Sequence, residues 1–215
     1  MMIKKIAIDG PAASGKGTLA KTLAMALSYD YLDTGTLYRA VARAVVSASI
    51  SADEIANQVD EITKIARDLD LPIINDDSLR TSQIATIASK IAPLPSVREA
   101  LTETQRRFAI QPPSGQGAVL DGRDIGTVIL PDADLKLYID ADVEVRAKRR
   151  YLELSAKDEH VTQAQILADL IERDARDKAR DTAPLTIAED AHVIDTSQMT
   201  AQEVLEQALN LVKRL

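Results

Sequence analysis

The segment IDGPAASGKGTLAK, residues 8–21, carries the residue types and nearly the spacing of a phosphate-binding loop. Such a loop has a glycine, four further residues and Gly-Lys, and then a Ser or Thr whose hydroxyl contacts magnesium. Gly10, Gly15 and Lys16 fit this pattern, but Gly17 occupies the hydroxyl position and Thr18 follows one place later. The N–H groups of a glycine-rich turn, together with the N-terminus of the helix behind it, would bind an anion such as phosphate.

We interpret the segment as a working loop that holds a metal less directly than usual. Lys16 is expected to bridge the outer phosphates, Gly17 to widen the space beside them, and Thr18 to present its hydroxyl from the first helical turn. A helix that merely starts at a glycine-rich turn is the alternative interpretation. The predicted nucleotide contacts of the loop are Gly10, Pro11, Ala12, Ala13, Ser14, Gly15, Lys16, Gly17 and Thr18.

A second group with suitable chemistry is formed by Arg173, Asp177 and Arg180. Their spacing of four and then three residues places all of them on one face of a helix. The forked guanidinium group of arginine matches phosphate oxygens. The same pattern is also typical of a solvated helix face whose ion pairs each contribute only about 0.3–0.5 kcal/mol, so the spacing by itself leaves both interpretations open.

Short β-like segments alternate with helical patterns along most of the chain. The expected strands are residues 3–9, 29–34, 117–122, 135–141 and 192–197, and the expected helices are 16–28, 36–48, 143–155, 163–180 and 200–214. This alternation predicts an α/β fold with a five-stranded parallel sheet and helices on both faces. Ligands of such sheets gather at the carboxyl ends of the strands, where Asp9, Asp33 and Asp121 would lie.

Two stretches interrupt the alternation. Residues 49–116 indicate helices over 52–68, 82–91 and 96–108, which predicts an inserted subdomain. A charged excursion around 152–163 has no strand signal, and we expect it to form a mobile cover. The expected organisation is a core of residues 1–48, 109–151 and 181–215, an insert of residues 49–108, and a lid with its returning helix at 152–180.

The composition disfavours several other classes of protein. The chain has 215 residues, of which 46% are apolar and 27% charged, so a packed core is expected rather than disorder. A net charge of −7 and 3% aromatic residues disfavour a nucleic-acid binder. The chain has no cysteine and only two distant histidines, so a Cys or His metal site is not expected. No apolar run reaches membrane length, and the stretch behind Lys4 and Lys5 is too short for a signal peptide. We therefore expect a cytoplasmic monomer.

Several segments together resemble the bacterial cytidylate kinases. The GKGT string is similar to the loop of nucleoside monophosphate kinases in general. The bacterial cytidylate kinases are resembled, in order, by YLDTGTLYRA (31–40), IASKIAPLPSVREAL (87–101), LDGRDIGTVILPDADLKLYIDA (120–141) and ERDARDKARDTAPL (172–185). The likeness spans nearly the whole chain, and DGRDIGTVILPDA is its most specific element.

The chain departs from this family pattern in two places. Thr34 stands where some members have Ser, which keeps the hydroxyl. The segment LPIINDDS, residues 71–78, stands in place of a long β-rich segment. We therefore expect a smaller and more helical monophosphate-binding subdomain than in those members.

The resemblance implies a P-loop kinase fold with a monophosphate-binding insert and a mobile lid. It also implies transfer of the γ-phosphoryl of ATP, with Mg²⁺, to the 5′-phosphate of CMP or dCMP, with neither nucleic acid nor a membrane as partner. By resemblance the catalytic residues are Lys16, Arg123 and Arg180. The CMP-binding residues that it implies are Thr34, Arg39, Ser89, Arg98, Arg123, Asp124, Arg173, Asp177 and Arg180.

Hydrogen-bond chemistry gives Asp124 a distinct task within this set. Cytosine offers an N4 amino donor where uracil offers an acceptor, and a carboxylate accepts from the first and repels the second. We therefore predict a preference for CMP over UMP of about ten- to a hundredfold. By resemblance Ser89 and Arg98 complete the base edge. The alternatives are a helix-capping or packed hydroxyl for Ser89 and a surface position for Arg98.

The remaining candidates concern phosphates, ribose and metal. By resemblance Arg39, Arg123 and Arg180 grip the acceptor phosphate, Arg173 and Asp177 meet the ribose hydroxyls, and Arg146 and Arg150 meet the ATP phosphates. Asp121 ends a buried strand and is a candidate to orient a magnesium-bound water. A turn-forming Asp is the alternative for that position, and Asp9 is expected to shape the turn into Gly10.

Three rival functions remain open to the sequence. The first is a kinase for another small acceptor, such as UMP or shikimate. The second is a non-catalytic ATP-binding sensor, which would need no CMP site. The third is an RNA-binding domain, which the charge and the scarcity of aromatic residues disfavour. In the kinase interpretation positioning and charge neutralisation carry the reaction, so neither a covalent nucleophile nor a catalytic His is expected.

Overall fold

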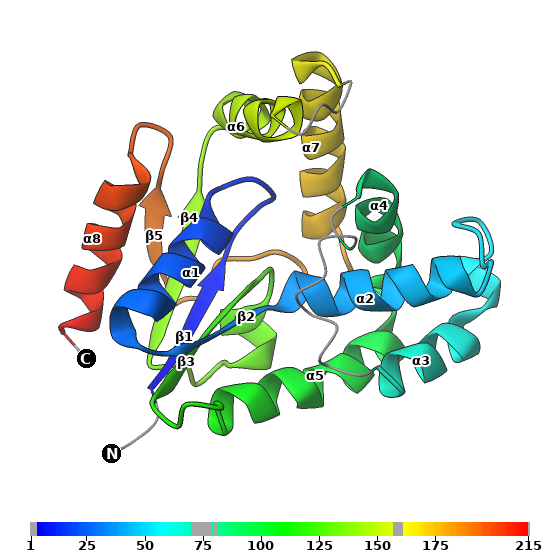
Figure 1. The fold of residues 1–215 in the computed structure, drawn as a ribbon, viewed down its shortest axis with the longest axis horizontal. Coiled ribbons are helices and arrows are strands. Elements are labelled where there is room, and N and C mark those ends of the chain that lie inside the picture. The colour runs from blue at the N-terminus through cyan, green and yellow to red at the C-terminus, as the bar shows by residue number, and fades with distance from the viewer. Residues whose placement is uncertain (1–3, 70–78, 80, 157–160, 215) are drawn as a thin grey trace. The chain divides into compact units, whose positions relative to one another are not determined.

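The computed structural model describes residues 4–69, 79, 81–156 and 161–214, and Figure 1 shows how the chain is folded. The elements in chain order are β1 (Lys4–Asp9), α1 (Lys16–Leu27), β2 (Asp30–Asp33), α2 (Thr34–Ser47), the 3₁₀ turn η1 (Ile55–Asn57), α3 (Val59–Arg67), α4 (Ser82–Ile91), α5 (Pro95–Ile110), β3 (Gly117–Gly122), the π-helical turn η4 (Ile125–Ile129), β4 (Leu135–Asp140), α6 (Val143–Ser155), α7 (Gln163–Lys178), β5 (His192–Asp195) and α8 (Ala201–Val212). The predicted α/β class and its five strands are therefore confirmed.

The strands form one parallel sheet in the order β2-β3-β1-β4-β5. The register between β1 and β3 pairs Ile8 with Asp121 and Asp9 with Gly122, and the register between β1 and β4 pairs Asp9 with Tyr138. Because successive side chains of a strand point to opposite faces, the side chains of Ile8 and Asp121 share one face of the sheet. The side chain of Asp9 lies on the other.

Helices α1 and α8 cover the first of these faces and lie side by side in Figure 1. Their apolar side chains pack against the apolar side chains that β1, β3 and β4 direct to this face, because these central strands are largely buried. The buried members of this core include Ile6, Ile8, Leu19, Leu23, Val119, Leu137, Ile139, Ile194, Val204 and Ala208.

Local signals in the sequence explain where several helices begin. Thr162 and Gln165 form a reciprocal capping box at the start of α7, and Thr200 and Glu203 do the same for α8. Thr81 accepts a hydrogen bond from Ile84 N at the start of α4. Each cap satisfies N–H groups that have no partner within the helix and contributes about 0.5–2 kcal/mol.

The chain divides into two compact units. One comprises Met1–Leu32 and Ala109–Leu215, and the other comprises Asp33–Phe108. The second unit is helical: α2 packs on α3 and α4, around buried side chains that include Leu37, Val41, Ile62 and Ile91. Among the described residues, no helix combines the length and the apolar character needed to cross a membrane.

The helices of the second unit differ in detail from the sequence-based expectation. In place of one helix over 52–68, the chain forms the short turn η1 and then α3, which begins after Gln58 with a φ angle of −118°. Residues 70–78 lie outside the described part of the chain, and so the expectation about LPIINDDS concerns residues that are not described. Of the charged excursion at 152–163, residues 157–160 are also not described, and α6 continues to Ser155.

Candidate functional site

The loop between β1 and α1 has the backbone shape of an anion-binding turn. Ala13 and Gly15 have φ angles of 60° and 90°, and positive φ values of this kind occur in the backbone nests that bind anions. Gly10 has a φ angle of 152°, and a Cβ placed there would lie 2.0 Å from Ile139 O, so only glycine fits. The first turn of α1 holds no acidic residue, which leaves its positive end available to an anion.

The side chains of this loop fit phosphate as well. Lys16 is buried, with Nζ 3.4 Å from Pro11 O. The Oγ of Ser14 is buried and, within the described part of the chain, has no hydrogen-bond partner. A buried hydroxyl without a partner is costly, and a bound phosphate oxygen would satisfy it. The backbone and the side chains of this loop are therefore suited to bind phosphate.

The structure shows what surrounds Gly17 and Thr18, the two positions at which the motif departs from the usual spacing. An added Cβ at Gly17 would lie 3.7 Å from Asp121 Oδ2 and 3.9 Å from Tyr31 Oη. Tyr31 donates to Asp121 Oδ1 at 2.8 Å, which fixes the orientation of this buried carboxylate. Thr18 is exposed on the first turn of α1. Gly17 therefore leaves room beside a carboxylate that is held in place from behind.

These residues fit a magnesium ion that arrives with a nucleotide. The described residues contain no cluster of three His, Cys, Asp or Glu side chains able to bind a metal. Magnesium commonly uses one or two carboxylates, phosphate oxygens and several waters. Asp121 and the Thr18 hydroxyl could supply oxygen atoms for that mode of binding.

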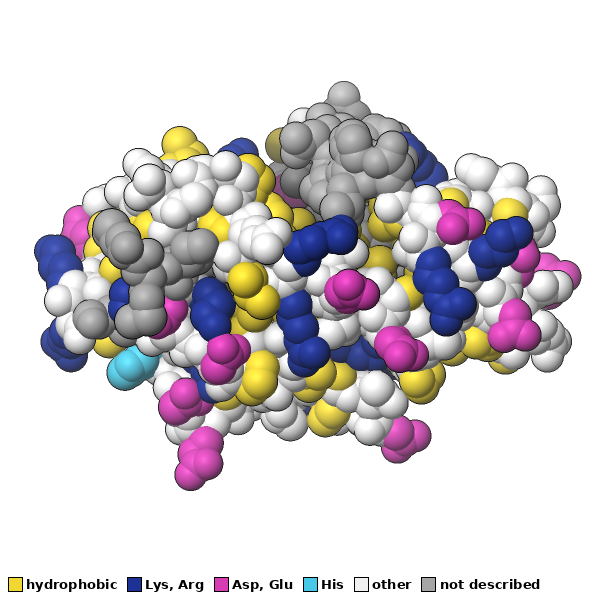
Figure 2. Space-filling model, turned by 90° about the horizontal axis from the view of Figure 1, so that it is seen from below, with side chains coloured by type: hydrophobic (Ala, Val, Ile, Leu, Met, Phe, Trp, Pro, Cys, Tyr) yellow, Lys and Arg dark blue, Asp and Glu magenta, His cyan; other side chains and the backbone are white. Residues whose placement is uncertain are grey.

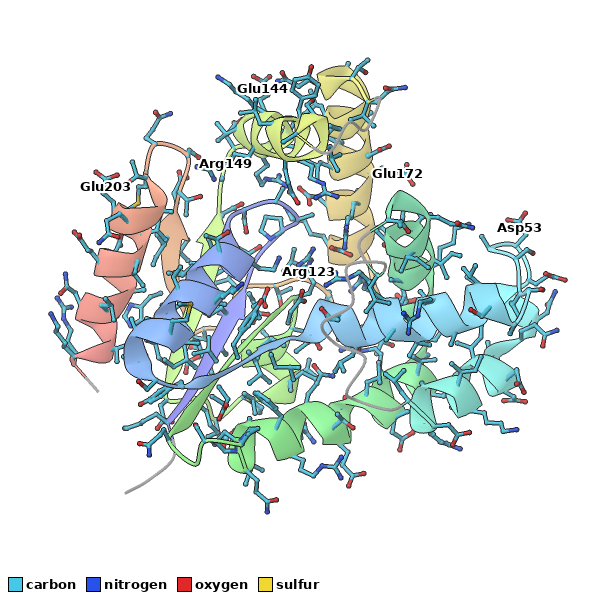
Figure 3. All side chains as sticks on the ribbon, in the orientation of Figure 1. Asp53, Arg123, Glu144, Arg149, Glu172 and Glu203 are labelled. Carbon is cyan, nitrogen blue, oxygen red and sulfur yellow. The ribbon has the colours of Figure 1, made fainter. Side chains whose placement is uncertain are left out.

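Two of the three arginines predicted for the acceptor phosphate, Arg123 and Arg180, meet at one buried carboxylate, whereas Arg39 pairs with Asp33. Asp177 has no exposed surface; its Oδ2 accepts from Arg123 Nε at 2.9 Å, and its Oδ1 accepts from Arg180 Nη2. Arg173 Nε lies 4.0 Å from Asp177 Oδ2. Figure 3 shows Arg123 in this part of the molecule, near α7. The solvated helix face that the spacing left open is therefore not what forms at Asp177.

Electrostatics explain why this carboxylate stays ionised. Burial by itself raises the pKa of Asp177, but the charges of Arg123, Arg180 and Arg173 outweigh burial and hold the pKa below the ordinary value of 3.8. The cluster thus has more positive than negative charge. It holds two guanidinium groups in fixed positions, and a doubly charged phosphate would neutralise the excess.

Each nitrogen of the Arg146 guanidinium group donates a hydrogen bond to a protein atom. Its Nε donates to Ala141 O at 2.9 Å, its Nη1 to Ala12 O at 3.1 Å and its Nη2 to Asp174 Oδ2 at 2.6 Å. This buried side chain ties the phosphate-binding loop to α6 and α7. Arg150, one turn further along α6, forms an exposed ion pair with Glu153 at 2.8 Å.

A third arginine of α6 was not singled out by the sequence. Arg149 donates to Thr196 O at 2.6 Å and to Thr196 Oγ1 at 3.0 Å, and Thr196 Oγ1 lies 3.0 Å from Ser14 O. Figure 3 shows Arg149 near α6. The segment after β5 is therefore attached to the back of the phosphate-binding loop. Only the position of Arg149 in a basic run hinted at this role.

The unit Asp33–Phe108 holds the remaining predicted residues. Arg39 Nη2 donates to Asp33 Oδ2 at 2.6 Å and to Thr36 Oγ1 at 2.8 Å. Arg98 is buried, donates to Ala92 O at 3.3 Å and lies over the Tyr38 ring, 5.9 Å from its centroid. This burial excludes the surface position considered for Arg98.

Two smaller residues of this unit are also buried. Ser89 lies in α4 beside core residues of that helix, and Thr34 is the first residue of α2. The structure thus places Thr34, Arg39, Ser89 and Arg98 in one unit, while Lys16, Asp121, Arg123 and Asp177 belong to the other.

The motif DGRDIGTVILPDA forms a structure that the sequence did not suggest. Asp124 precedes the π-helical turn η4, and its carbonyl accepts from Val128 N at 2.9 Å and Ile129 N at 3.1 Å. Asp9, expected to shape the turn into Gly10, instead accepts from Ile125 N at 2.8 Å and Gly126 N at 2.7 Å. The pairing of β1 with β3 places the side chains of Asp9 and Asp121 on opposite faces of the sheet. No pattern in the sequence indicated the π-turn.

Comparisons with known proteins identify the family of the chain. A family model described as cytidylate kinase matches residues 6–214. A cytidylate kinase from Azorhizobium caulinodans is 50% identical over 209 residues, 97% of this chain and 98% of the relative. A cytidylate kinase from Paramagnetospirillum magneticum is 48% identical over 207 residues, 96% of each chain.

Similar solved structures support the fold alone. An uncharacterised protein from Eubacterium ventriosum has a TM-score of 0.55 at 15% identity, with 98% of each chain covered. A gluconokinase from Sinorhizobium meliloti has a TM-score of 0.50 at 14% identity, with 98% of this chain and 92% of that one covered. The match of the family model over nearly the whole length, together with relatives at about half identity, shows that the chain belongs to the cytidylate kinase family.

Proposed function

We propose that the chain transfers the γ-phosphoryl of MgATP to the 5′-phosphate of CMP or dCMP and gives CDP or dCDP. The observation that carries this proposal is the cluster of Arg123, Arg180 and Asp177, which belongs to the same unit as the phosphate-binding loop. A kinase that acts on a nucleotide must hold two polyanions despite their repulsion. Fixed guanidinium groups beside a phosphate cradle are the means to do so.

The reaction assigns each group a task of positioning or charge neutralisation. The loop residues 10–18 bind the phosphates of ATP, and Lys16 bridges its outer phosphates. Arg123 and Arg180 neutralise charge on the acceptor phosphate, so that its oxygen can approach the γ-phosphorus in line. Asp177 retains lone pairs beyond those used by the arginines, and with Arg173 it meets the ribose hydroxyls.

The base is recognised by hydrogen bonding. Asp124 accepts from the N4 amino group of cytosine, and Ser89 and Arg98 complete the edge. Thr34 and Arg39 bind the same nucleotide, and Arg39 contributes a further positive charge for the phosphate. Magnesium would come with ATP and would neutralise charge on the transferred phosphoryl group, with Asp121 orienting one of its waters.

Arg146 and Arg150 serve the ATP side in different ways. Arg146 contributes from behind the loop, through its bond to Ala12 O. Arg150 is proposed to contact ATP phosphates directly, after exchange of its exposed partner Glu153.

The decisive experiment is an activity screen of nucleotide donors against acceptors, with UMP and shikimate among the acceptors. We expect ATP and CMP or dCMP to give the highest kcat/KM. Lys16→Ala should lower activity by at least about a hundredfold, because an outer-phosphate contact is lost. Lys21→Ala, an exposed lysine of α1, is the matched control and should leave the rate unchanged. Activity of Lys16→Ala within tenfold of wild type would refute the assignment.

The rival functions give different results in simple measurements. A non-catalytic sensor would bind ATP but not CMP, so calorimetric titration with CMP alone separates it from a kinase. A nucleic-acid binder would present a continuous basic surface, whereas Figure 2 shows Lys and Arg side chains interspersed with Asp and Glu on the face that it presents.

A further inference from the structure

The buried carboxylate of Asp9 holds the start of the π-turn with both of its oxygens. Oδ1 accepts from Ile125 N at 2.8 Å and Oδ2 accepts from Gly126 N at 2.7 Å. Asp9 is 5% exposed, and Ile125 and Gly126 are buried as well. Hydrogen bonds from backbone N–H groups to an ionised carboxylate are short and stronger than neutral ones, so these contacts fix the turn firmly.

The far side of the turn is held by a second buried charge. Lys136 lies on the same face of the sheet as Asp9, and its Nζ donates to Pro131 O at 2.7 Å and to Asp190 Oδ1 at 2.8 Å. Gly126 fits between the two side chains. A Cβ at Gly126 would lie 3.1 Å from Lys136 Cδ and 3.4 Å from Asp9 Oδ2. The turn therefore has little room to shift.

The residue that this clamp positions is Asp124. It precedes Ile125 directly, and its carbonyl accepts from Val128 N and Ile129 N within the π-turn. π-helical turns are rare and occur often at functional sites. Any movement of Ile125 would displace the backbone of Asp124, and with it the carboxylate proposed to read the base.

We propose that Asp9 is a positioning residue for acceptor selectivity: by clamping Ile125 and Gly126, it sets the place of the Asp124 carboxylate that distinguishes CMP from UMP. This inference rests on the proposed function, because it assigns a cause to the base preference of that reaction. It does not make Asp9 a contact of either nucleotide.

The raised pKa of Asp9 shows that its buried charge depends on the two hydrogen bonds of the clamp. Burial raises the pKa of Asp9 from 3.8 to about 6, while the bonds from Gly126 N and Ile125 N act in the opposite direction. Among the charged groups near it, Asp124 raises the pKa and Lys16 lowers it. Burial raises the pKa of Tyr138, and the charges of Asp140, Asp174 and Asp9 act in the same direction. The two backbone donors are thus what offsets the cost of a buried charge.

The test compares kcat/KM for CMP and for UMP in Asp9→Asn. Asparagine keeps the size of the side chain but turns one acceptor into a donor, which opposes one of the two N–H groups. We expect the CMP-to-UMP ratio to fall by about tenfold, toward the ratio of Asp124→Ala, because small displacements of a positioned group are costly. The KM for ATP should stay within about twofold of wild type.

Asp53→Asn is the matched control. It removes an exposed carboxylate that belongs to the other compact unit, and should leave the ratio unchanged. A ratio in Asp9→Asn that equals the wild-type ratio would overturn the proposal, whether both acceptors lose the same factor or neither changes. A rise in the KM for ATP at a constant ratio would also overturn it, because Asp9 would then act through Gly10.

A second variant and a second measurement cover the remaining outcomes. Gly126→Ala keeps the Asp9 charge but pushes between Lys136 and Asp9, so the ratio should fall in the same direction if Asp9→Asn does not fold. If the wild type phosphorylates no CMP, the proposed function is wrong. In that case amide exchange at Ile125 and Gly126 tests the clamp itself: faster exchange in Asp9→Asn supports it, and unchanged exchange overturns it.

Discussion

Single aspartates of this chain have different tasks because of the face and the partners that each one meets. Asp9 and Asp121 both lie at or next to a strand end, yet the register of β1 and β3 sends them to opposite faces of the sheet. Asp121 faces α1 and accepts a hydrogen bond from Tyr31, and we propose that it orients a metal-bound water. Asp9 faces η4 and holds it. Asp177, in α7, meets only arginines among the charged groups that shift its pKa.

At the residue scale, Asp177→Asn should lower the free energy of unfolding by about 3–5 kcal/mol near neutral pH. Removing one partner of a buried pair leaves the other charge uncompensated, and here Arg123 and Arg180 both lose their partner. Urea unfolding monitored by circular dichroism measures the change. Asp181→Asn, an exposed neighbour, is the control.

The difference in unfolding free energy between wild type and Asp177→Asn should depend on pH. The pKa of Asp177 is below its ordinary value of 3.8, so its contribution to stability is complete above about pH 4 and is lost as the pH falls through the lowered pKa. The stability difference between wild type and Asp177→Asn should therefore be constant at neutral pH and shrink below about pH 4. A difference that grew on acidification would contradict the account of this cluster.

At the scale of elements, the phosphate-binding loop is held by side chains from segments that are distant from it in the sequence. Arg146 of α6 donates to Ala12 O in the loop and to Asp174 in α7. Thr196, which follows β5 and is held by Arg149, donates to Ser14 O. A loop of this kind binds through its backbone, so its shape must be fixed before the ligand arrives. The bonds to Ala12 O and Ser14 O fix that shape.

Arg146→Lys tests the support of the loop. Lysine cannot reproduce three bonds in different directions, so we expect a loss of about 2–3 kcal/mol in unfolding free energy without nucleotide. The KM for ATP should rise by about tenfold. Both are measured in the same preparation by urea unfolding and a coupled assay. Lys148→Ala, exposed on α6, is the control.

The two effects of Arg146→Lys distinguish support from contact. If the guanidinium bound ATP directly and held nothing else, the KM would rise while the stability without nucleotide stayed that of wild type. That outcome would contradict the role inferred from the bonds to Ala12 O and Asp174.

At the scale of the whole molecule, the chain has two compact units and an acidic net charge of −7. The positive charges proposed to bind ligands are single side chains, such as Lys16, Arg123 and Arg180, and the described residues form no extended basic surface on the face that Figure 2 presents. Local placement of charge suits small anionic ligands, whereas long polyanions such as RNA need an extended basic surface.

ATP binding should stabilise the molecule by an amount that mass action sets. At a hundred times Kd, the added free energy is about 2.7 kcal/mol, which corresponds to a rise in Tm of about 5–10 °C for a chain of this size. Scanning calorimetry measures the shift without relying on tryptophan, which the chain lacks. Lys16→Ala should lose most of the shift with ATP and keep the shift with CMP. Equal shifts with ATP in both proteins would contradict the role of Lys16.

The sequence alone determined the α/β class, the five strands, the main helices and the family, because these depend on local patterns. Strand segments are short and apolar, helices carry caps and periodic apolar residues, and the glycine-lysine loop has a fixed spacing. Helical spacing grouped Arg173, Asp177 and Arg180, and the family resemblance grouped Arg39, Arg123 and Arg180.

Only the tertiary structure decided which atoms these residues meet. The clamp of Asp9 on Ile125 and Gly126 and the bonds of Arg146 to Ala12 and Asp174 join segments 28 to 134 residues apart. Contacts at such separations depend on strand order and on the face to which each side chain points. A change of one residue in register would reverse that face, so no local pattern in the chain contains this information.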